Sequence, residues 1–451
     1  MVSGLAIQAK NIVVRGTWKA PADSDRRLII SYFKDPLIRD ETRVSVEPDQ
    51  EGSFELSIEA SHPLQLGLFY ESVLCFPGDT IVFNIYGVPK QYSLEFKGAN
   101  AAIHGFFYRN KKRNGQFEVY KYKFESDSSL LAYKSAAQRY LAVSFELLDS
   151  LSATHAIAPH GSQIIRDLLR IDHYNYLLQP LARVSNTPSQ YFSDFDKSIF
   201  GNEALLSFPS FVNLCGAYND AVLTPLAPRE KRTDSTFVAQ DIYSAERNFV
   251  PAVSNAILYG IFFRLTEVGG QQNRDQITKL HDKLAKFYSQ ETARNDMLNE
   301  LYNNFLKQGK GFPPEVLNVK MKDLKGNWMT LAEVISHGKI IYIDLWASWC
   351  GPCISEMQSE RELIAKIGKE KVKFLLISID QGDKPWQRAV AKIDVPGEHF
   401  RMDGQFESVL LRYLAVKSIP RYLIINKDGI LMKRDAPRPG VVLYNPHILG
   451  I

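Results

Sequence analysis

Two cysteines, Cys350 and Cys353, lie in the stretch "IIYIDLWASWCGPCISEM" (340–357), with Gly351 and Pro352 between them. A thiol pair at this spacing can cycle between dithiol and disulfide, supply half of a zinc site, or pack as two buried thiols. An apolar, strand-like run precedes the pair and a helix-like segment follows it. The pair therefore lies where a strand gives way to a helix, which favours the redox interpretation.

A helix N-terminus at this point would activate Cys350. Free N–H groups and a partial positive charge favour the thiolate, which is the form that attacks disulfides. Pro352 falls in the first turn, where its missing N–H costs nothing. Cys353 lies on the same side of that turn, within reach of the Cys350 sulfur. We expect Cys350 to attack a substrate disulfide and Cys353 to resolve the mixed disulfide.

A carboxylate, Asp344, precedes the cysteines on the apolar strand, between Ile343 and Leu345. If it lies beneath the thiols, burial raises its pKa, and it can accept the proton of Cys353 during resolution. A strand-end Asp that faces solvent explains the same residue about as well. The residues alone leave both positions open.

The other interpretations of the thiol pair are weaker. Zinc needs four ligands, usually from a second cysteine pair or from paired histidines, and the nine histidines are scattered without such spacing. The interpretation as two buried thiols does not explain why Gly351 and Pro352 lie between the cysteines. The stretch "GGQQNRDQ" (269–276) lacks the spacing of a dinucleotide or phosphate loop. We therefore expect no metal and no cofactor, only a reversible disulfide between Cys350 and Cys353.

Three regions of different composition make up the 451 residues, which exceed one domain at roughly 100–200 residues per domain. Residues 1–97 contain short alternating strands with turn signals, which predict an antiparallel β-sandwich-like domain. Residues 98–308 place apolar side chains at helical spacing, which predicts an α-helical domain. Residues 309–451, with a core at about 313–435, alternate strands and helices, which predicts a central sheet covered by helices.

The charge balance excludes few classes but argues against a nucleic-acid partner. There are 54 basic and 50 acidic residues, and the formal charge of +4 is spread evenly. No apolar run approaches about 18 residues, so no transmembrane segment is expected. No signal peptide is visible, which fits a cytoplasmic protein and equally a chain whose leader was removed. Cys75 and Cys215 lie in apolar settings and are interpreted as small buried hydrophobes, without support for a bridge between them.

The stretch "DLWASWCGPC" resembles the active site of the thioredoxin superfamily, and Asp344 matches that family's buried Asp. In "KSIPRYLIINKDG", the Ile419–Pro420 bond matches the cis-proline that opens the strand opposite the cysteines. Residues 313–435, with Glu356 and Met357 just after the cysteines, are most similar to TlpA/ResA-type extracytoplasmic thiol-disulfide reductases. Residues 1–97 resemble, more weakly, the β-rich domain that precedes such modules in bacteroidete-type bacteria.

The resemblance implies a thioredoxin-like fold at the C-terminal end and a protein-disulfide reductase of the periplasm or cell envelope. Its partners would be a protein disulfide substrate and an upstream thiol donor. The substrate-binding residues that it implies are Trp349, Gly351, Pro352, Ile419, Pro420 and Arg421. We expect Trp346 in the core and Trp349 on the surface near the sulfur. A binding or scaffold protein with an auxiliary redox module is the alternative, and a peroxidase is a third, which the WCGPC context disfavours.

Two further features depart from the family pattern. Arg421 follows the proline where a small residue is common, so it could alter substrate choice, pair with an acidic group of a partner, or be a tolerated surface residue. The last segment, "RDAPRPGVVLYNPHILGI", contains three prolines and no helical stripe, although these proteins normally end in a helix packed on the sheet. We interpret this as a chain that is truncated or altered at its end.

Overall fold

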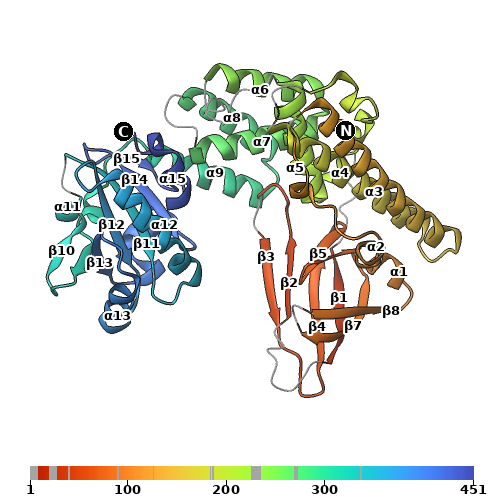
Figure 1. Ribbon diagram of the computed structural model, residues 1–451, viewed down its shortest axis with the longest axis horizontal. Coiled ribbons are helices and arrows are strands. Elements are labelled where there is room, and N and C mark those ends of the chain that lie inside the picture. Colours follow the sequence, from red (N-terminus) through yellow and green to blue (C-terminus); the bar gives the residue numbers. More distant parts are fainter. Residues whose placement is uncertain are drawn as a thin grey trace. The chain divides into compact units, whose positions relative to one another are not determined.

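The computed structural model describes residues 9–19, 28–38, 41–88, 91–124, 126–182, 184, 187–224, 235–268, 273–335 and 338–450 (Figure 1). Contacts group the chain into two compact units. The first extends into helix α7 (Pro251–Val268) as far as Gly260, and the second takes over at Ile261. The division of the sequence into three domains stays a prediction.

The first unit opens with a β-sandwich, as the alternating pattern predicts. Its strands are β1 (Lys10–Lys19), β2 (Leu28–Phe33), β3 (Glu41–Val46), β4 (Ser53–Ala60), β5 (Leu64–Leu68), β6 (Glu71–Cys75), β7 (Thr80–Val88) and β8 (Gln91–Lys97). Among the described residues they form two sheets, in the orders β4-β1-β7-β8 and β3-β2-β5-β6. Ile12, Val14 and Trp18 of β1 face the core, and Asn11, Arg15 and Lys19 stay at the surface or edge.

Two details of the sandwich differ from the prediction. No turn signal separates β5 from β6, because the hairpin between them turns at Phe69, whose φ of 55° lies in the left-handed region usually signalled by Gly or Asn. Strands β1 and β7 run parallel, although an antiparallel sandwich was expected. They approach closely at Gly16, where an added Cβ would lie 1.7 Å from the Phe83 carbonyl oxygen.

The middle region is helical, as predicted. Besides α7, its helices are α1 (Ala101–His104), α2 (Phe106–Asn114), α3 (Asp127–Ala153), α4 (Pro159–Leu178), α5 (Pro209–Tyr218), α6 (Ser235–Asn248), α8 (Arg274–Phe287) and α9 (Thr292–Lys307). Local chemistry sets their starts: the Ser126 hydroxyl accepts the Ser129 N–H at the start of α3, and prolines open α4 and α5. In the described residues no helix is both long and apolar enough to span a membrane.

The second unit contains a mixed sheet with helices beside it (Figure 1). Its strands are β9 (Lys320–Asp323), β10 (Trp328–Thr330), β11 (Ile340–Trp346), β12 (Val372–Ser378), β13 (Glu398–Met402), β14 (Arg421–Ile425) and β15 (Leu431–Lys433). Its other helices are α10 (Pro314–Leu317), α11 (Leu331–Val334), α12 (Gly351–Ile367), α13 (Asp383–Ile393), α14 (Val409–Tyr413) and α15 (Pro439–Tyr444). The described strands follow the order β10-β9-β13-β12-β11-β14-β15.

The central position of β11 explains its apolar sequence. It pairs in parallel with β12 on one side and antiparallel with β14 on the other. Every residue from Ile341 to Trp346 is buried, including Asp344. A strand that is covered on both faces has no side exposed to solvent. Its sequence therefore does not alternate between apolar and polar residues and is a nearly continuous apolar run.

The end of the chain forms a short helix although its sequence has no helical stripe: residues Pro439–Tyr444 form α15, followed by a 3-10 turn at Pro446–Leu449. Pro439 and Pro446 open these turns at first positions, where no N–H donor is needed. Val442 and Leu449 anchor the segment in the core of the unit.

Candidate functional site

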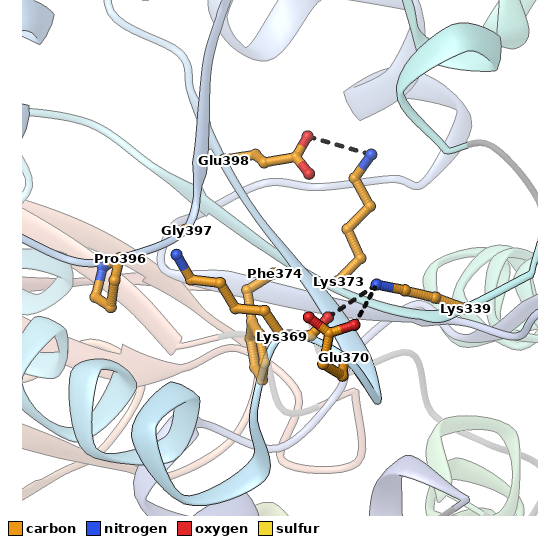
Figure 2. Close-up of a pocket in the computed structure, with 8 residues that line it drawn as sticks. All are labelled: Lys339, Lys369, Glu370, Lys373, Phe374, Pro396, Gly397 and Glu398. Atoms are coloured by element: carbon orange, nitrogen blue, oxygen red, sulfur yellow. Dashed lines mark hydrogen bonds and ion pairs between the residues drawn. The ribbon is translucent and has the colours of Figure 1, made fainter.

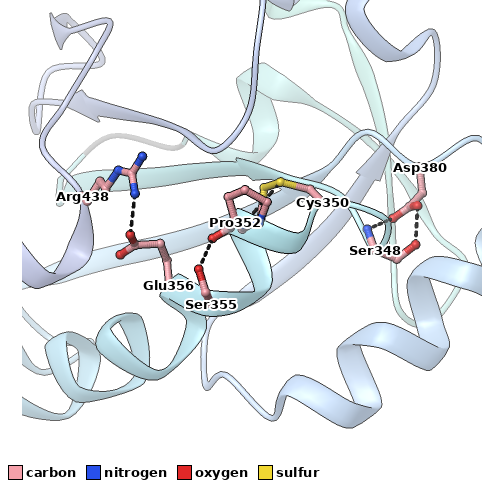
Figure 3. Close-up of a disulfide and its surroundings, with 8 residues drawn as sticks. Ser348, Cys350, Pro352, Ser355, Glu356, Asp380 and Arg438 are labelled. Carbon is pink, nitrogen blue, oxygen red and sulfur yellow. Dashed lines mark hydrogen bonds and ion pairs between the residues drawn. A yellow bond between two sulfur atoms is a disulfide. The ribbon is translucent and has the colours of Figure 1, made fainter. Parts of the chain in front are cut away.

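The cysteine pair joins the end of β11 to the start of α12. Cys350 is the N-cap residue of α12, and its sulfur accepts the backbone N–H of Cys353 at 3.2 Å. The two sulfurs form a disulfide, with the Cα atoms 5.2 Å apart (Figure 3). Pro352 lies in the first turn, as predicted, and because proline has no backbone N–H it leaves no unpaired donor there. The helix start therefore offers a thiolate at Cys350 both a hydrogen bond and the positive end of the dipole.

A buried carboxylate holds the loop before Cys350 in place. Asp380, which follows β12, accepts the Ser348 backbone N–H at 2.9 Å and the Ser348 hydroxyl at 2.6 Å (Figure 3). It also accepts the Ser378 hydroxyl at 2.7 Å. These contacts fix the backbone two residues before the reactive cysteine. The sequence reasoning missed Asp380, although its place directly after a buried strand was a signal.

The second family marker lies at the same edge of the sheet. The Ile419–Pro420 peptide bond is cis, as the resemblance implied. It leads into β14, whose first residue, Arg421, pairs in register with Leu345 near the end of β11. The Arg421 side chain forms an ion pair with Asp435. The structure thus pairs Arg421 within the chain itself, and a role of Arg421 toward a substrate or partner stays a prediction.

The residues around the disulfide differ in exposure. Trp349 is 56% exposed and Trp346 is fully buried, as expected. Gly351 and Pro352 are exposed, whereas Cys350 is only 5% exposed and Cys353 is buried. An exposed ring beside one partly accessible sulfur can meet a protein surface. That Trp349, Gly351, Pro352, Ile419, Pro420 and Arg421 bind substrate stays a prediction.

Asp344 lies inside the protein, which excludes the alternative that it faces solvent. Burial raises its pKa from an ordinary value of 3.8 to about 7, and a hydrogen bond from Glu360 opposes part of that rise. Glu360, on α12, is also 0% exposed. Burial and repulsion from Asp344 hold the pKa of Glu360 well above its ordinary value. Two buried acids thus lie within reach of each other, one on β11 and one on α12, the two elements that the cysteine pair joins.

Sequence reasoning missed Glu360, although a signal was present. Cys353, Met357, Glu360 and Ile364 recur at helical spacing, so a charged residue occupied the buried stripe of α12. Glu356, one turn earlier, is closer to the surface and accepts the Arg438 guanidinium at 2.8 Å (Figure 3).

This unit has a hollow at the end of the sheet opposite the cysteines (Figure 2). It has a volume of about 350 Å³ and is lined by residues at the amino ends of β11, β12 and β13. Two of its lysines are paired, Lys339 with Glu370 at 3.7 Å and Lys373 with Glu398 at 3.2 Å, and Lys369 also lines it. The cysteines follow the carboxyl end of β11, so this hollow takes no part in their chemistry.

The two remaining cysteines are not suited to thiol-disulfide exchange. Cys75 and Cys215 are buried and free, so they do not form a bridge. Burial raises the pKa of both thiols well above the ordinary value. Within the described ranges, no group of three or more His, Cys, Asp or Glu residues is arranged to hold a metal ion.

The relatives of this chain identify the C-terminal module. A family model described as Redoxin matches residues 307–440. Thioredoxin of Mycolicibacterium smegmatis is 33% identical over 102 residues, which are 23% of this chain and 69% of that protein. The chain belongs to the thioredoxin superfamily. Its disulfide site and its relatives show that this member of the superfamily is a thiol-disulfide oxidoreductase of the TlpA/ResA type.

Two further relatives agree with that membership. Thiol-disulfide oxidoreductase ResA of Bacillus cereus is 24% identical over 136 residues, which are 30% of this chain and 76% of the relative. The ResA protein of Bacillus thuringiensis is 26% identical over 115 residues, so this thioredoxin-superfamily chain spans 64% of its length. A crystal structure of a protein assigned as a thiol-disulfide oxidoreductase from Bacteroides vulgatus is 32% identical, covering 30% of this chain and 99% of that one, with a TM-score of 0.25.

Proposed function

We propose that the protein reduces disulfides of other proteins outside the cytoplasm. The observation that carries the proposal is the position of Cys350, which caps α12, binds the Cys353 N–H and lies beside the exposed Trp349. A thiolate in that position is stabilised by the helix end and is accessible from one side only. The similarity to extracytoplasmic TlpA/ResA-type reductases supports the compartment.

In the proposed cycle the Cys350 thiolate attacks a substrate disulfide and forms a mixed disulfide. Cys353 then loses its proton and attacks the Cys350 sulfur, which closes the intramolecular disulfide and releases reduced substrate. Asp344 accepts the Cys353 proton, since a base with a pKa of about 7 suits that task near neutral pH. An upstream thiol donor reduces the pair again, and no other cofactor takes part.

Insulin reduction with a dithiol donor tests the proposal. The wild-type chain should reduce insulin, and Cys350→Ser should lose at least about a hundredfold in rate, because the attacking sulfur is gone. The matched control is Cys75→Ala, which removes a buried free thiol and should keep the wild-type rate.

A trapping variant completes the test. Cys353→Ala should accumulate a mixed disulfide with insulin that a dithiol releases. Equal rates for wild type and Cys350→Ser, or no trapped species, would refute the reductase and favour the binding or scaffold protein. Fractionation of cells that make the full chain checks the compartment, and recovery only in the cytosol would contradict it.

A further inference from the structure

Glu360 is an acid on the helix that begins at the cysteine pair. Thiol-disulfide exchange between two cysteines does not require an acid at this position. It is 0% exposed and lies on the same face of α12 as Cys353 and Met357. Side chains of a helix lean toward its N-terminus, so the Glu360 carboxyl lies over the preceding turn, on the Cys353 side. A buried carboxylate without a partner is strongly unfavourable. The protonation state of Glu360 therefore needs an explanation.

The neighbour of Glu360 is a second acid. The carboxyls of Glu360 and Asp344 lie within hydrogen-bonding reach of each other. No N–H or other hydroxyl group of the described residues donates to any of their four oxygens. Two carboxylates cannot hydrogen bond to each other, because ionised oxygens only accept. A single proton between the two acids turns one of them into a donor and satisfies both.

The surroundings decide which acid keeps the proton. Glu360 meets the negative charges of both Asp344 and Glu356, whereas Asp344 meets that of Glu356 and gains a hydrogen bond from Glu360. Glu356 is itself compensated by Arg438. From the sheet, the neighbours are two tyrosines. Tyr342 donates its hydroxyl to the Pro437 carbonyl at 2.7 Å, and the Tyr422 hydroxyl is buried without a partner among the described residues. No buried cation faces Glu360 in this set.

We propose that Glu360 stays protonated through the neutral range and donates its carboxyl hydrogen to the Asp344 carboxylate, as a positioning residue that sets how strongly Asp344 binds a proton. The inference rests on the proposed reductase function. In the resolving step the Cys353 thiol gives its proton to Asp344. The Cys353 sulfur bonds to the Cys350 sulfur while the bond from Cys350 to the substrate sulfur breaks. The electron pair of that bond leaves with the substrate thiolate, which takes up a proton afterwards.

The resolving step can be isolated with an aromatic disulfide that releases a coloured thiolate. Reduced full-length chain should release one equivalent when Cys350 attacks and a second when Cys353 resolves. Glu360→Gln keeps an N–H donor beside Asp344, so the pH midpoint of the second phase should stay within about half a unit. Glu360→Met removes the donor, so the midpoint should rise by about one unit and the rate at pH 7 should fall up to about tenfold.

Glu362→Gln is the matched control, since it removes an exposed glutamate from the same helix. It should leave both phases unchanged. A shift of the Glu360→Gln midpoint toward lower pH would show that Glu360 is ionised, because removal of its charge would then relieve Asp344, and would overturn the proposal. Wild-type midpoints in both Glu360 variants would also overturn it, since Glu360 would then only fill space.

A second measurement separates this inference from the proposed function. In full-length chain labelled with carbon-13 at the glutamate carboxyls, the Glu360 resonance is identified by its loss in Glu360→Gln. It should keep the chemical shift of a neutral carboxyl across pH 7, and the shift of a carboxylate there would overturn the proposal. The spectrum reports on Glu360 even if the chain reduces no insulin. Melting temperatures of the variants show that each one is folded.

Discussion

Asp344 illustrates how a buried ionisable side chain lowers stability near neutral pH. Its pKa is about 7 in the folded chain and near 3.8 when exposed, so between these values the unfolded form is ionised while the folded form keeps its proton. Raising the pH through this window therefore favours unfolding. The contribution of Asp344 to the free energy of unfolding is fully present below about pH 4 and is lost by about pH 7. Above pH 7 this contribution changes little. Three pKa units correspond to about 4 kcal/mol.

Asp344→Asn should remove the part of the pH dependence that Asp344 causes, whereas Glu360, whose pKa also lies above its ordinary value, keeps its own part. The variant is expected to be more stable than the wild type by up to about 4 kcal/mol at pH 8, and the gain should shrink toward zero near pH 4. Urea unfolding of the second unit at several pH values measures it. A gain of equal size at pH 4 and pH 8 would contradict the assigned cause, since amide packing rather than proton binding would then explain it.

Single residues of the site differed in how far the sequence could place them. Cys350 and Cys353 were identified by spacing, and the position of Cys350 at a helix start followed from a strand-like and a helix-like run. The burial of Asp344 could not be decided, because strand sequences do not show which face of a sheet is covered. Glu360 went unnoticed since its partner lies on another element, and only the fold brings the two together.

At the scale of elements, the helices and strands that depend on residues within one segment were predicted, and those that depend on contacts between segments were not. Helices α3 and α4 and strand β11 follow from periodicity and caps within their own residues. The β5–β6 hairpin has no turn residue to signal it, and its strands are held by the sheet. Helix α15 was missed because proline ends a helix when it lies inside and favours one when it lies first.

The close approach of β1 and β7 makes a prediction about Gly16. A Cβ at that position would overlap the Phe83 carbonyl, so Gly16→Ala should lower stability by about 1–3 kcal/mol through forced separation of the strands. Thermal melting of the full chain measures it. Gly216→Ala is the matched control, because Gly216 lies within α5 with open space around it and alanine favours helix. Equal melting of Gly16→Ala and wild type would contradict the steric argument.

At the scale of the whole molecule, the chain confines its thiol chemistry to one place. It has four cysteines, of which two form the disulfide at the start of α12 and two are buried elsewhere. Burial raises the pKa of Cys75 and Cys215, so neither offers a thiolate near neutral pH. The cysteine pair is thereby protected from exchange with the other thiols of its own chain.

Thiol labelling of the full-length chain tests this separation. In the oxidised native chain, a thiolate-specific alkylating reagent should modify no cysteine within minutes, because the two free thiols are buried. After mild reduction one cysteine should react fast, namely Cys350, which is 5% exposed, whereas Cys353 is 0% exposed. Unfolding the oxidised chain should then reveal Cys75 and Cys215, and unfolding the reduced chain all four. Fast labelling of Cys75 or Cys215 in the native chain would show that a second thiol is available, and the redox cycle would then need to include it.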